Sequence, residues 1–288
     1  MLDVTGYLAR LGLDHPGEPT LDALFAIHRA QVERVAYTTV DIQRGRPPSI
    51  DPYETAARVV ATGRGGYCYH LNGALSVVLA ALGYDVHRHR GWVWPDPDGE
   101  PFQPYANHLP LTVHGLPSPD NPDGAWLFDA GLGDALHEPI ALRDGTYDQG
   151  GFVYQMGPAP RVPGGWRFQH DHAGSFIGMD FSLAEATMAD FAVGHVDLST
   201  SPASGFVQRL TAQRRYADRF DKLVSCTLRR VRPTGETTVA LGSSAEVRAV
   251  LADEFGLPLD DWEPGEWDAV YQRARAAQEE YDRTVAHA

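Results

Sequence analysis

The sequence is poor in cysteine and in long apolar runs, and both shortages exclude classes of protein. Its 288 residues include two cysteines, too few for a disulfide framework, which favours a reducing compartment. The most apolar run, 74–82, is interrupted by Ser76 and is far too short to span a membrane. Residues 1–6 lack the basic and apolar stretches of a signal peptide. We therefore expect a cytoplasmic protein without a membrane partner.

Positive charge is also scarce. Lysine and arginine number 24 against 38 aspartates and glutamates, which gives a formal charge of −14. A surface this acidic excludes nucleic acid as the main partner, because phosphate binding needs clustered cations. Lys222 is the single lysine of the chain, and we attribute this to genome composition with no functional weight. Four arginines form a local basic run whose default interpretation is a solvated face: Arg209, Arg214, Arg215 and Arg219.

Apolar spacing and capping residues predict helices in the first third of the chain. Asp3, Thr20 and Asp51 each precede a segment with helical spacing, and each has a side chain that caps a helix. A further helix is expected from about Cys68 to Leu82, where a glycine follows.

After residue 83 the pattern changes to short strands with frequent turns, including a turn at 95–99. Strands are expected over 85–94, 109–113, 126–128, 152–156, 166–170 and 175–179. Such a series is typical of a small barrel or sandwich. Ser182 and Glu185 form a capping box that predicts a helix ending near Gly194.

The tail combines both kinds of element. Segments 222–231 and 237–241 predict a hairpin, and Ser243 with Glu246 predicts the start of a helix. A last helix is expected from Glu266. The coarse architecture is helices, then a barrel, then a mixed end.

A glycine-flanked cysteine is the most informative feature. Residues 64–73 read Arg-Gly-Gly-Tyr-Cys-Tyr-His-Leu-Asn-Gly, so Cys68 follows two glycines that permit a sharp turn and stands where a helix begins. A helix N-terminus stabilises a thiolate, the species that covalent acyl transfer requires. A buried structural cysteine is the alternative interpretation. Cys226 is expected to be a core residue of a strand.

A nucleophilic cysteine needs a base and a group that orients the base. His108 begins an alternating strand on the face opposite to the apolar residues that follow it, and we expect it to point out of the core. Asp129 ends the apolar strand 126–128, where an unpaired carboxylate would be costly to bury. If Asp129 pairs with His108, it fixes the imidazole tautomer and favours its charged form, as in a Cys-His-Asp triad. Twelve histidines make a chance assignment easy, so the triad needs further support.

The joint pattern resembles the arylamine N-acetyltransferase family. In that family an Arg-Gly-Gly-x-Cys motif is followed by a histidine that opens a strand and by an aspartate before a Gly-x-Gly turn. Here these are residues 64–68, His108 and 129–133. Segment 199–206 resembles the family's crossing from the barrel to the third domain, and 251–257 resembles its late helix end. The resemblance covers most of the chain from residue 1 to about residue 260.

The resemblance implies an α+β fold of three domains with a cysteine-peptidase-like core. These are an N-terminal helical bundle with Cys68 (1–84), a central β-barrel with His108 and Asp129 (85–197), and a C-terminal α/β lid (198–288). It also implies two-step (ping-pong) acyl transfer. Cys68 would take an acyl group from a coenzyme A thioester, usually acetyl-coenzyme A, and an aromatic amine or hydrazine would accept it. Backbone N–H groups near Cys68 would hold the oxyanion.

The resemblance also assigns binding residues. Four residues are expected to line the acceptor pocket: Tyr37, Val93, Leu132 and Phe206. Gly131 and Gly133 are expected to lie beside the arm of the thioester, and Arg64 is expected to be structural. For the basic run 209–219, a contact to coenzyme A phosphates or to an acidic carrier protein becomes the sharper interpretation.

Three departures from the family pattern concern the substrate and leave the triad untouched. His70 and Leu71 stand in the region where the family usually has a glutamate, and 36–39 reads Ala-Tyr-Thr-Thr in place of Pro-Phe-Glu-Asn. Leu132 replaces a common phenylalanine and removes an aromatic wall, while Tyr37 adds a hydroxyl, so we expect a larger or more polar pocket. These changes resemble the amide synthases that close ansamycin macrolactams, which take a polyketide thioester from a carrier protein.

Other activities remain open at this point. A Cys-His-Asp amidohydrolase would release the acyl group to water, a transglutaminase-like enzyme would exchange amides, and a binding protein would carry an inactive triad. The pairs His87-x-His89 and His170-x-His172 lack a third ligand, so we interpret them as exposed strand histidines and expect no metal.

Overall fold

Helices form the N-terminal part of the molecule. The computed structural model describes residues 2–94, 105–263 and 265–286, so the turn expected at 95–99 lies outside the described residues. The helices here are α1 (Val4–Arg10), α2 (Leu21–Arg34), α3 (Val40–Gln43), α4 (Pro52–Thr62) and α5 (Cys68–Ala81). The expected caps are confirmed, because the side chains of Asp3, Thr20 and Asp51 accept bonds from backbone N–H groups of the first turns. No helix in the described ranges is long and apolar enough to cross a membrane.

The middle of the chain forms one eight-stranded antiparallel sheet that nearly closes into a barrel. Its strands are β2 (Asp85–Trp94), β3 (Leu111–His114), β4 (Trp126–Phe128), β5 (Ile140–Ala141), β6 (Gly145–Gln149), β7 (Phe152–Pro158), β8 (Trp166–Gln169) and β9 (Gly178–Glu185). The strand order is β5-β4-β3-β2-β9-β8-β7-β6. The strand expected from residue 109 begins only at Leu111, because Pro110 has no N–H to donate.

The helix expected after Ser182 is wrong. Residues 178–185 form β9, in which Phe181 pairs with Gly91 and is fully buried in the barrel. The helix follows later, as a short 3₁₀ turn and then α6 (Ala192–Thr200), and its capping box is made by Thr187 and Asp190. Pairing with a strand far away in sequence outweighs the local capping signal.

The C-terminal part is a second antiparallel sheet flanked by helices. The sheet order is β1-β10-β11-β12-β13, with β1 (Tyr37–Thr38), β10 (Thr211–Arg215), β11 (Phe220–Val224), β12 (Thr227–Arg232) and β13 (Gly235–Ala240). The helices are α7 (Gly205–Gln208), α8 (Ser244–Asp253) and α9 (Glu266–Ala286). The strand expected over 222–231 is two strands, because Ser225 adopts a left-handed φ of 53° and makes a tight turn. Cys226 therefore lies in a buried turn and not in a strand.

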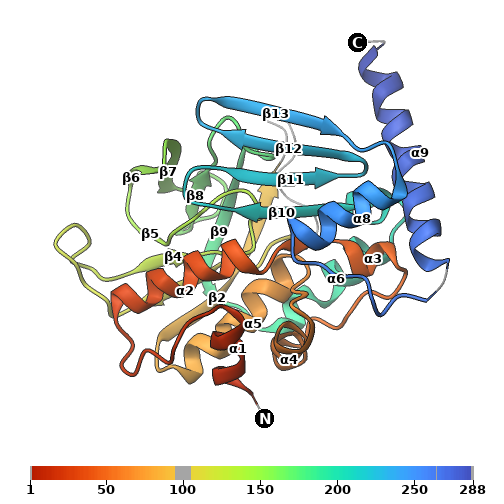
Figure 1. Ribbon diagram of the computed structural model, residues 1–288. Helices are drawn as coiled ribbons and strands as arrows, with labels where there is room; N and C mark the ends of the chain where they lie inside the picture. Colours follow the sequence, from red (N-terminus) through yellow and green to blue (C-terminus); the bar gives the residue numbers. More distant parts are fainter. Residues whose placement is uncertain (1, 95–104, 264, 287–288) are drawn as a thin grey trace.

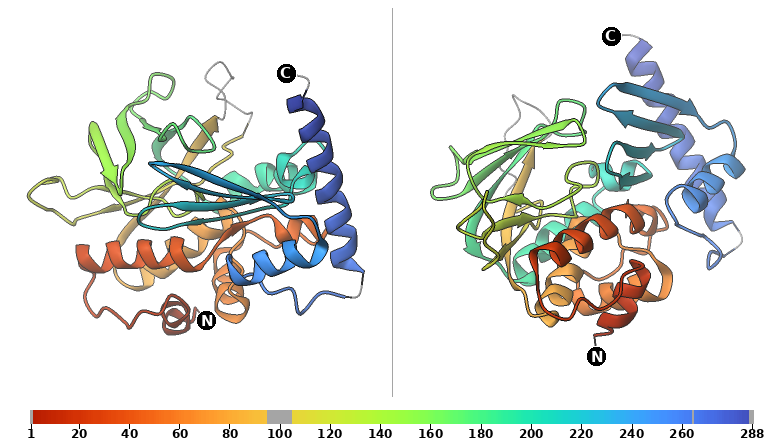
Figure 2. Two further views of the ribbon diagram at one scale, coloured as in Figure 1. Left: turned by 45° about the horizontal axis from the view of Figure 1, so that its top comes forward. Right: turned by 60° about the vertical axis from the view of Figure 1, so that its left-hand side comes forward.

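These three parts pack around three apolar clusters, and Figure 2 separates them well. Its right-hand view shows the N-terminal helices below, the barrel strands to the left and the C-terminal sheet with α8 and α9 to the right. One cluster joins the helices to β3 and β4, a second fills the barrel, and a third lies between the C-terminal sheet, α8 and α9. The predicted α+β class is confirmed, whereas the exact domain limits stay predictions.

Strand β1 comes from the N-terminal part and forms one edge of the C-terminal sheet. Tyr37 pairs with Gln213, Thr38 pairs with Ala212, and the Thr38 N–H also donates to the Gly66 carbonyl just before Cys68. In Figure 1 this sheet accordingly lies over α2 and α5, with its far edge, β13, at the top. The edge strand of the C-terminal sheet is thus hydrogen-bonded directly to the loop that leads into α5.

Arg215 fastens the C-terminal sheet to the barrel. Its side chain is fully buried, so the expected solvated face is wrong at this position. The guanidinium donates to the Ala135 carbonyl at 2.7 Å and the Gln149 carbonyl at 3.2 Å, and it lies 4.5 Å from the centre of the Phe152 ring. These partners are distant in sequence, so no local pattern indicates them.

Arg215→Met is expected to lower the free energy of unfolding by about 3 kcal/mol, because several buried hydrogen bonds to a charged group disappear while the apolar stem is kept. Urea denaturation measures the change. Arg232→Met is the control, because Arg232 pairs with Asp218 at the surface, and its loss should stay below about 1 kcal/mol. Equal losses in the two variants would show that Arg215 does not hold the sheet in place.

Candidate active site

Cys68 is the first residue of helix α5 and lines a cavity. The thiol belongs to a residue only 3% exposed, and Sγ lies 3.7 Å from the Asn107 carbonyl oxygen. Gly66 precedes it with a φ of +104°, and a Cβ at that position would lie 2.8 Å from Nδ1 of His70. The turn into the helix therefore requires glycine here. No side chain caps the first turn of α5, in which the His70 N–H donates to the Tyr67 carbonyl at 2.9 Å.

His108 and Asp129 meet beside this thiol. Nε2 of His108 lies 2.7 Å from Oδ2 of Asp129, and both residues are buried. Cys68 lies close enough to His108 to affect the charge of the imidazole, and Nδ1 is the ring nitrogen that Asp129 does not engage. The structure thus brings together the three residues of the predicted triad.

The expected outward orientation of His108 is wrong. Its main chain pairs with Gly91 of β2, and the other side of this segment is covered by α5. Tyr69 of that helix donates to the Ala106 carbonyl and Asn72 donates to the Leu109 carbonyl. Alternation along a strand separates two faces, but it does not reveal that a helix covers the second one.

Asp129 is held by two further donors. Its Oδ1 accepts from Nδ2 of Asn72 at 2.6 Å and from the Gly131 N–H at 3.0 Å. Asn72 stands one helical turn after Cys68, so a single turn of α5 carries both the thiol and a hydrogen-bond donor to the Asp129 carboxylate. Sequence analysis missed Asn72, although its spacing of four from Cys68 places the two on one face of the helix.

Gly131 allows the turn after β4 to touch the start of α5. A Cβ at this position would lie 2.9 Å from the Cys68 Cα and 2.8 Å from Nδ2 of Asn72. Backbone and a fixed amide cannot move aside, so any larger residue would separate Asp129 from the helix. Glycine at position 131 is therefore a condition for assembling the three side chains.

The electrostatics of the site favour a charged imidazole. Burial alone opposes the charge, but the Asp129 carboxylate and Cys68 raise the pKa of His108 to about 10. The neighbouring His28 behaves in the opposite way, because burial lowers its pKa to about 4 and its Nδ1 bonds the His137 carbonyl at 3.0 Å. At neutral pH the site therefore holds one imidazolium, His108, beside a neutral histidine.

A cavity of about 390 Å³ opens above Cys68 and His108. Its wall includes all four residues expected in the acceptor pocket, Tyr37, Val93, Leu132 and Phe206, together with Gly131. Gly133 lies elsewhere, against the side chain of Gln213. A second cavity of about 370 Å³ adjoins the first and shares Asn107, Leu198, Gly205 and Phe206 with it. Whether these residues bind substrate stays a prediction.

Sequence analysis missed the contribution of the C-terminal sheet to this wall. The additional lining residues come from the end of α7, from β10 and from β11: Arg209, Thr211, Gln213, Lys222 and Val224. They carry no local motif. Their position follows from strand pairing, because Tyr37, Gln213 and Lys222 stand side by side across β1, β10 and β11.

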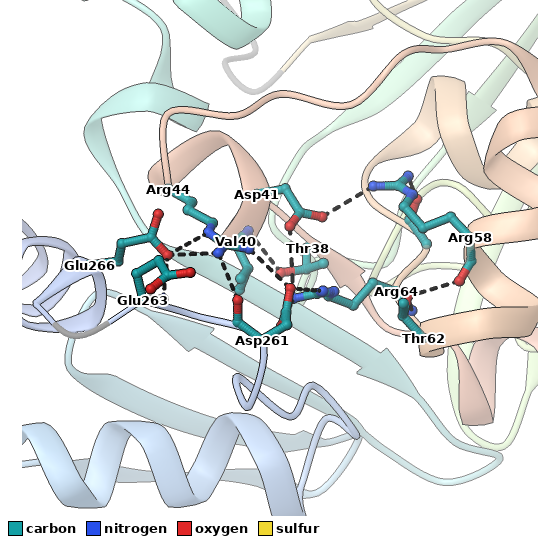
Figure 3. A network of polar contacts seen from close by, with 11 residues as sticks. Thr38, Val40, Asp41, Arg44, Arg58, Thr62, Arg64, Asp261, Glu263 and Glu266 are labelled. Atoms are coloured by element: carbon teal, nitrogen blue, oxygen red, sulfur yellow. Dashed lines mark hydrogen bonds and ion pairs between the residues drawn. The ribbon is translucent and has the colours of Figure 1, made fainter.

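Arg64 of the cysteine motif belongs to a network of ion pairs (Figure 3). Its guanidinium binds both carboxylate oxygens of Asp261, at 3.0 and 2.7 Å, and Asp261 also binds Arg44. Arg58 joins the network from α4 through Asp41 and donates to the Gly65 carbonyl at 2.6 Å. Arg64 therefore ties the loop before Cys68 to the segment that leads into α9, which agrees with a structural role.

Two further histidine expectations need correction. His89 and the side chain of His170 are buried, so exposure is the wrong interpretation for one member of each His-x-His pair. His89 bonds Thr112 at 2.8 Å, and His170 lies 3.4 Å from Asp134. Within 2–94, 105–263 and 265–286, no group of three or more His, Cys, Asp or Glu side chains is arranged to hold a metal ion.

Comparisons with known proteins agree on one family. A family model described as N-acetyltransferase matches residues 20–263. An arylamine N-acetyltransferase of Mycolicibacterium smegmatis is 31% identical over 273 residues, which are 90% of this chain and 94% of that protein. The structure of Mycobacterium marinum arylamine N-acetyltransferase in complex with CoA has a TM-score of 0.82 and 30% identity, and the match covers 94% of this chain and 98% of that one. A proansamycin X synthase of Amycolatopsis mediterranei is 27% identical over 161 residues, 54% of this chain and 58% of that protein.

Asp129→Asn is expected to slow alkylation of Cys68 by iodoacetamide at pH 7 by about tenfold or more, in a chain that also carries Cys226→Ala. Without the carboxylate, burial lowers the pKa of His108, and the imidazolium that stabilises the thiolate is lost. The unmodified site should react at nearly the same rate from pH 7 to pH 9, because His108 stays charged over this range. The variant should instead gain rate with pH, as an ordinary thiol does.

The circular dichroism spectrum and melting curve of the variant serve as the control for folding. An unchanged alkylation rate in a folded Asp129→Asn protein would remove Asp129 from the triad.

Proposed function

The chain belongs to the arylamine N-acetyltransferase family, and on that premise we propose that Cys68 carries an acetyl group from acetyl-coenzyme A to the nitrogen of an aromatic amine or hydrazine. The chain is an N-acyltransferase by its family, and the proposal concerns its nucleophile, donor and acceptor. The observation that carries it is the buried Cys68–His108–Asp129 contact at the head of a helix, in the wall of a cavity of ligand size.

In the first half-reaction the Cys68 thiolate attacks the carbonyl carbon of the thioester. A bond forms between Sγ and the acyl carbon, the carbon–sulfur bond of the donor breaks, and the leaving thiolate takes the proton of the His108 imidazolium. Backbone N–H groups near Cys68, at the uncapped start of α5, would hold the oxyanion of the tetrahedral intermediate.

In the second half-reaction the amine attacks the acyl-cysteine. Neutral His108 takes a proton from the attacking nitrogen, the amide forms, and Cys68 leaves as a thiolate. The charged pair is thereby restored. Asp129 keeps Nε2 of His108 engaged through both steps, so that Nδ1 stays directed at the sulfur and the reacting groups.

Two features support coenzyme A as the carrier of the acyl group. The Mycobacterium marinum relative has a structure in complex with CoA. The cavity beside Cys68 shares lining residues with a second cavity, and the two together offer room for the long arm of a thioester. We expect the Gly131–Gly133 turn to lie beside this arm, and we expect the reaction to take place in the cytoplasm.

A macrolactam-forming amide synthase is the second candidate. The partial likeness to a proansamycin X synthase favours it, as do Tyr37 and Leu132 in the cavity wall. Its donor would be a polyketide thioester on a carrier protein, and its acceptor the chain's own aryl amine. A hydrolase or transglutaminase-like enzyme would form the same acyl-cysteine and differ in the group that attacks it.

Mixing the protein with acetyl-coenzyme A is expected to add the mass of one acetyl group, as measured by intact mass spectrometry, because the activated thiol forms a stable acyl-enzyme. Addition of an aniline should remove the added mass and yield an acetanilide. Cys68→Ala should abolish the adduct, whereas Cys226→Ala should leave it unchanged, since Cys226 lies in a turn of the C-terminal sheet.

Equal labelling of the two variants would exclude Cys68 as the nucleophile. If the adduct is absent while Cys68 still reacts fast with iodoacetamide, the donor is not acetyl-coenzyme A, and the amide synthase is favoured. Loss of the adduct at one rate with and without an amine would favour the hydrolase.

Leu132→Phe is expected to lower kcat/KM for bulky bicyclic amines by about tenfold while changing the value for aniline by less than about threefold. A ring at this position fills part of the cavity next to Cys68, and a misplaced acceptor loses rate steeply. Steady-state kinetics with 2-aminofluorene and aniline measure the difference. The same loss for both amines would show that Leu132 does not set the size of the acceptor.

A further inference from the structure

The one lysine of the chain faces the cavity that contains Cys68. Lys222 lies in β11, beside Gln213 of β10, in the middle of the C-terminal sheet (Figure 1). Lys222 and Val224 stand two positions apart on one face of the strand, and both line the cavity. Leu223 between them is fully buried in the apolar cluster between the sheet and helices α8 and α9. The side chain of Lys222 therefore points to the space that the thiol also borders.

The ammonium group of this lysine has no close partner. In the described part of the chain, no hydrogen bond or ion pair engages it. The carboxylate with the largest effect on its charge is Asp134, whose oxygens already bond Ser175 and His170. No contact of the folded chain thus holds the nitrogen of Lys222 in one place.

The surroundings of Lys222 favour its neutral form. Burial lowers the pKa of Lys222, Asp134 opposes that change, and Arg229 and Arg209 lower the pKa further. An amine attacks a carbonyl carbon only when it is neutral, and a lysine with a lowered pKa holds more of that form at neutral pH. Lys222 therefore has the chemistry of a nucleophile as well as a place in the cavity wall.

A short stretch of sheet separates the lysine from the cysteine. Tyr37, Gln213 and Lys222 stand side by side across three strands, and neighbouring strands lie about 4.8 Å apart. Tyr37 lines the cavity together with Cys68, and the thiol is close enough to affect its pKa. The four-carbon stem of a lysine is long and flexible. We therefore expect the amine to reach an acyl group on Sγ across this one space of about 390 Å³.

We propose that Lys222 is a site of self-acetylation, at which acetyl-Cys68 transfers its acetyl group to the Lys222 amine of the same chain when no external amine is bound. The inference rests on the proposed function, because the acetyl-cysteine is the donor. Genome composition accounts for the scarcity of lysine, but it does not account for the position of the one lysine that the chain has.

The transfer is an attack of an amine on a thioester. A bond forms between Nζ of Lys222 and the carbonyl carbon of acetyl-Cys68, and the bond from that carbon to Sγ breaks. Cys68 leaves as a thiolate, and neutral His108 takes the proton that the nitrogen loses. The product is an amide, which is more stable than the thioester, and Lys222 loses its positive charge. Cys68 is then free to accept a second acetyl group from the donor.

Acetylation changes the cavity. Lys222 and Arg209 both line it, so the modified wall carries one positive charge fewer and one acetyl group more within the same small space. The modified chain is therefore a distinct form of the enzyme, and it accumulates when the donor is present and the acceptor is scarce.

The test is a long incubation with excess acetyl-coenzyme A and no acceptor, followed by intact mass spectrometry before and after treatment with hydroxylamine. Hydroxylamine removes an acetyl group from a thioester and leaves an amide intact. Brief mixing should give one acetyl group, all of it removed by hydroxylamine. Long incubation should add a second acetyl group that hydroxylamine does not remove.

A tryptic digest places the stable acetyl group. Lys222 is the one cleavage site inside the segment 220–229, which is bounded by Arg219 and Arg229. Acetylation of Lys222 blocks that site, so the intact peptide 220–229 should appear with one added acetyl group. A stable acetyl group found at the N-terminal amine, with Lys222 unmodified, would overturn the proposal.

Two variants test the route of the acetyl group. Cys68→Ala should acquire acetyl-Lys222 at least about tenfold more slowly, because the lysine must then react directly with the donor in solution. Lys222→Arg should form the labile adduct and no stable one. Equal formation of acetyl-Lys222 with and without Cys68 would overturn the transfer from the cysteine.

Arg230→Lys in a chain that also carries Lys222→Arg is the matched control. Arg230 follows Arg229 in β12 and lies on the opposite face of the sheet, where it pairs with Glu254 at 2.6 Å. This chain again has one lysine in the same sheet, but that lysine does not border the cavity. It should stay unmodified, and acetylation at the rate of Lys222 would show that position in the cavity has no part in the reaction.

An external acceptor should protect the lysine. Saturating aniline consumes the acetyl-cysteine and should slow formation of acetyl-Lys222 by about tenfold. An unchanged rate would mean that the acetyl group does not come from Cys68.

The two kinds of adduct separate this inference from the proposed function. A protein that forms no hydroxylamine-labile acetyl group contradicts acetyl-coenzyme A as the donor, and both proposals fail together. A protein that forms the labile group and leaves Lys222 unmodified after long incubation contradicts the self-acetylation alone.

Discussion

The site depends on one buried carboxylate. Asp129 ends a strand inside the protein, where its charge needs donors, and it finds them in His108, in Asn72 and in the Gly131 N–H. These donors come from the barrel, from helix α5 and from the turn after β4, so the carboxylate joins the N-terminal helices to the barrel exactly where Cys68 begins its helix. The glycine at 131 and the buried orientation of His108 both follow from this contact, because neither a Cβ at 131 nor an outward imidazole would leave the three donors in place.

The elements that the sequence predicts well are those whose signal lies within a few residues. Asp51 caps α4 and the Ser243–Glu246 box opens α8, because capping is a contact between neighbours in the chain. The box at 182–185 is the same kind of signal, yet this segment is a strand, because Phe181 fills the barrel and its backbone pairs with β2. The turn at Ser225 has no glycine or asparagine to indicate its left-handed φ. Where tertiary pairing decides, the local pattern is insufficient.

The difference between local signals and long-range contacts also separates the site residues that the sequence predicts from those that it misses. Cys68, His108 and Asp129 could be selected from the sequence because their joint pattern resembles that of a known family, and local chemistry alone would not have chosen His108 among twelve histidines. The C-terminal sheet could not be placed, because its position depends on two residues of β1 that pair with β10 and on Arg215, whose partners are carbonyls far away in sequence. A run of arginines looks uniform in the sequence. In the structure Arg215 is a buried clamp, while Arg209 lines the cavity.

The candidate triad and the C-terminal sheet also differ in how they are held in the fold. The candidate triad is held by the helices and the barrel, where a Cβ at Gly131 would meet Cys68 and Asn72, whereas the C-terminal sheet supplies another part of the cavity wall. Lys222 and Arg209 belong to this part of the wall, whereas the donors to Asp129 are His108, Asn72 and the Gly131 N–H. The candidate triad and the additional wall therefore come from separate parts of the fold that meet at a single cavity.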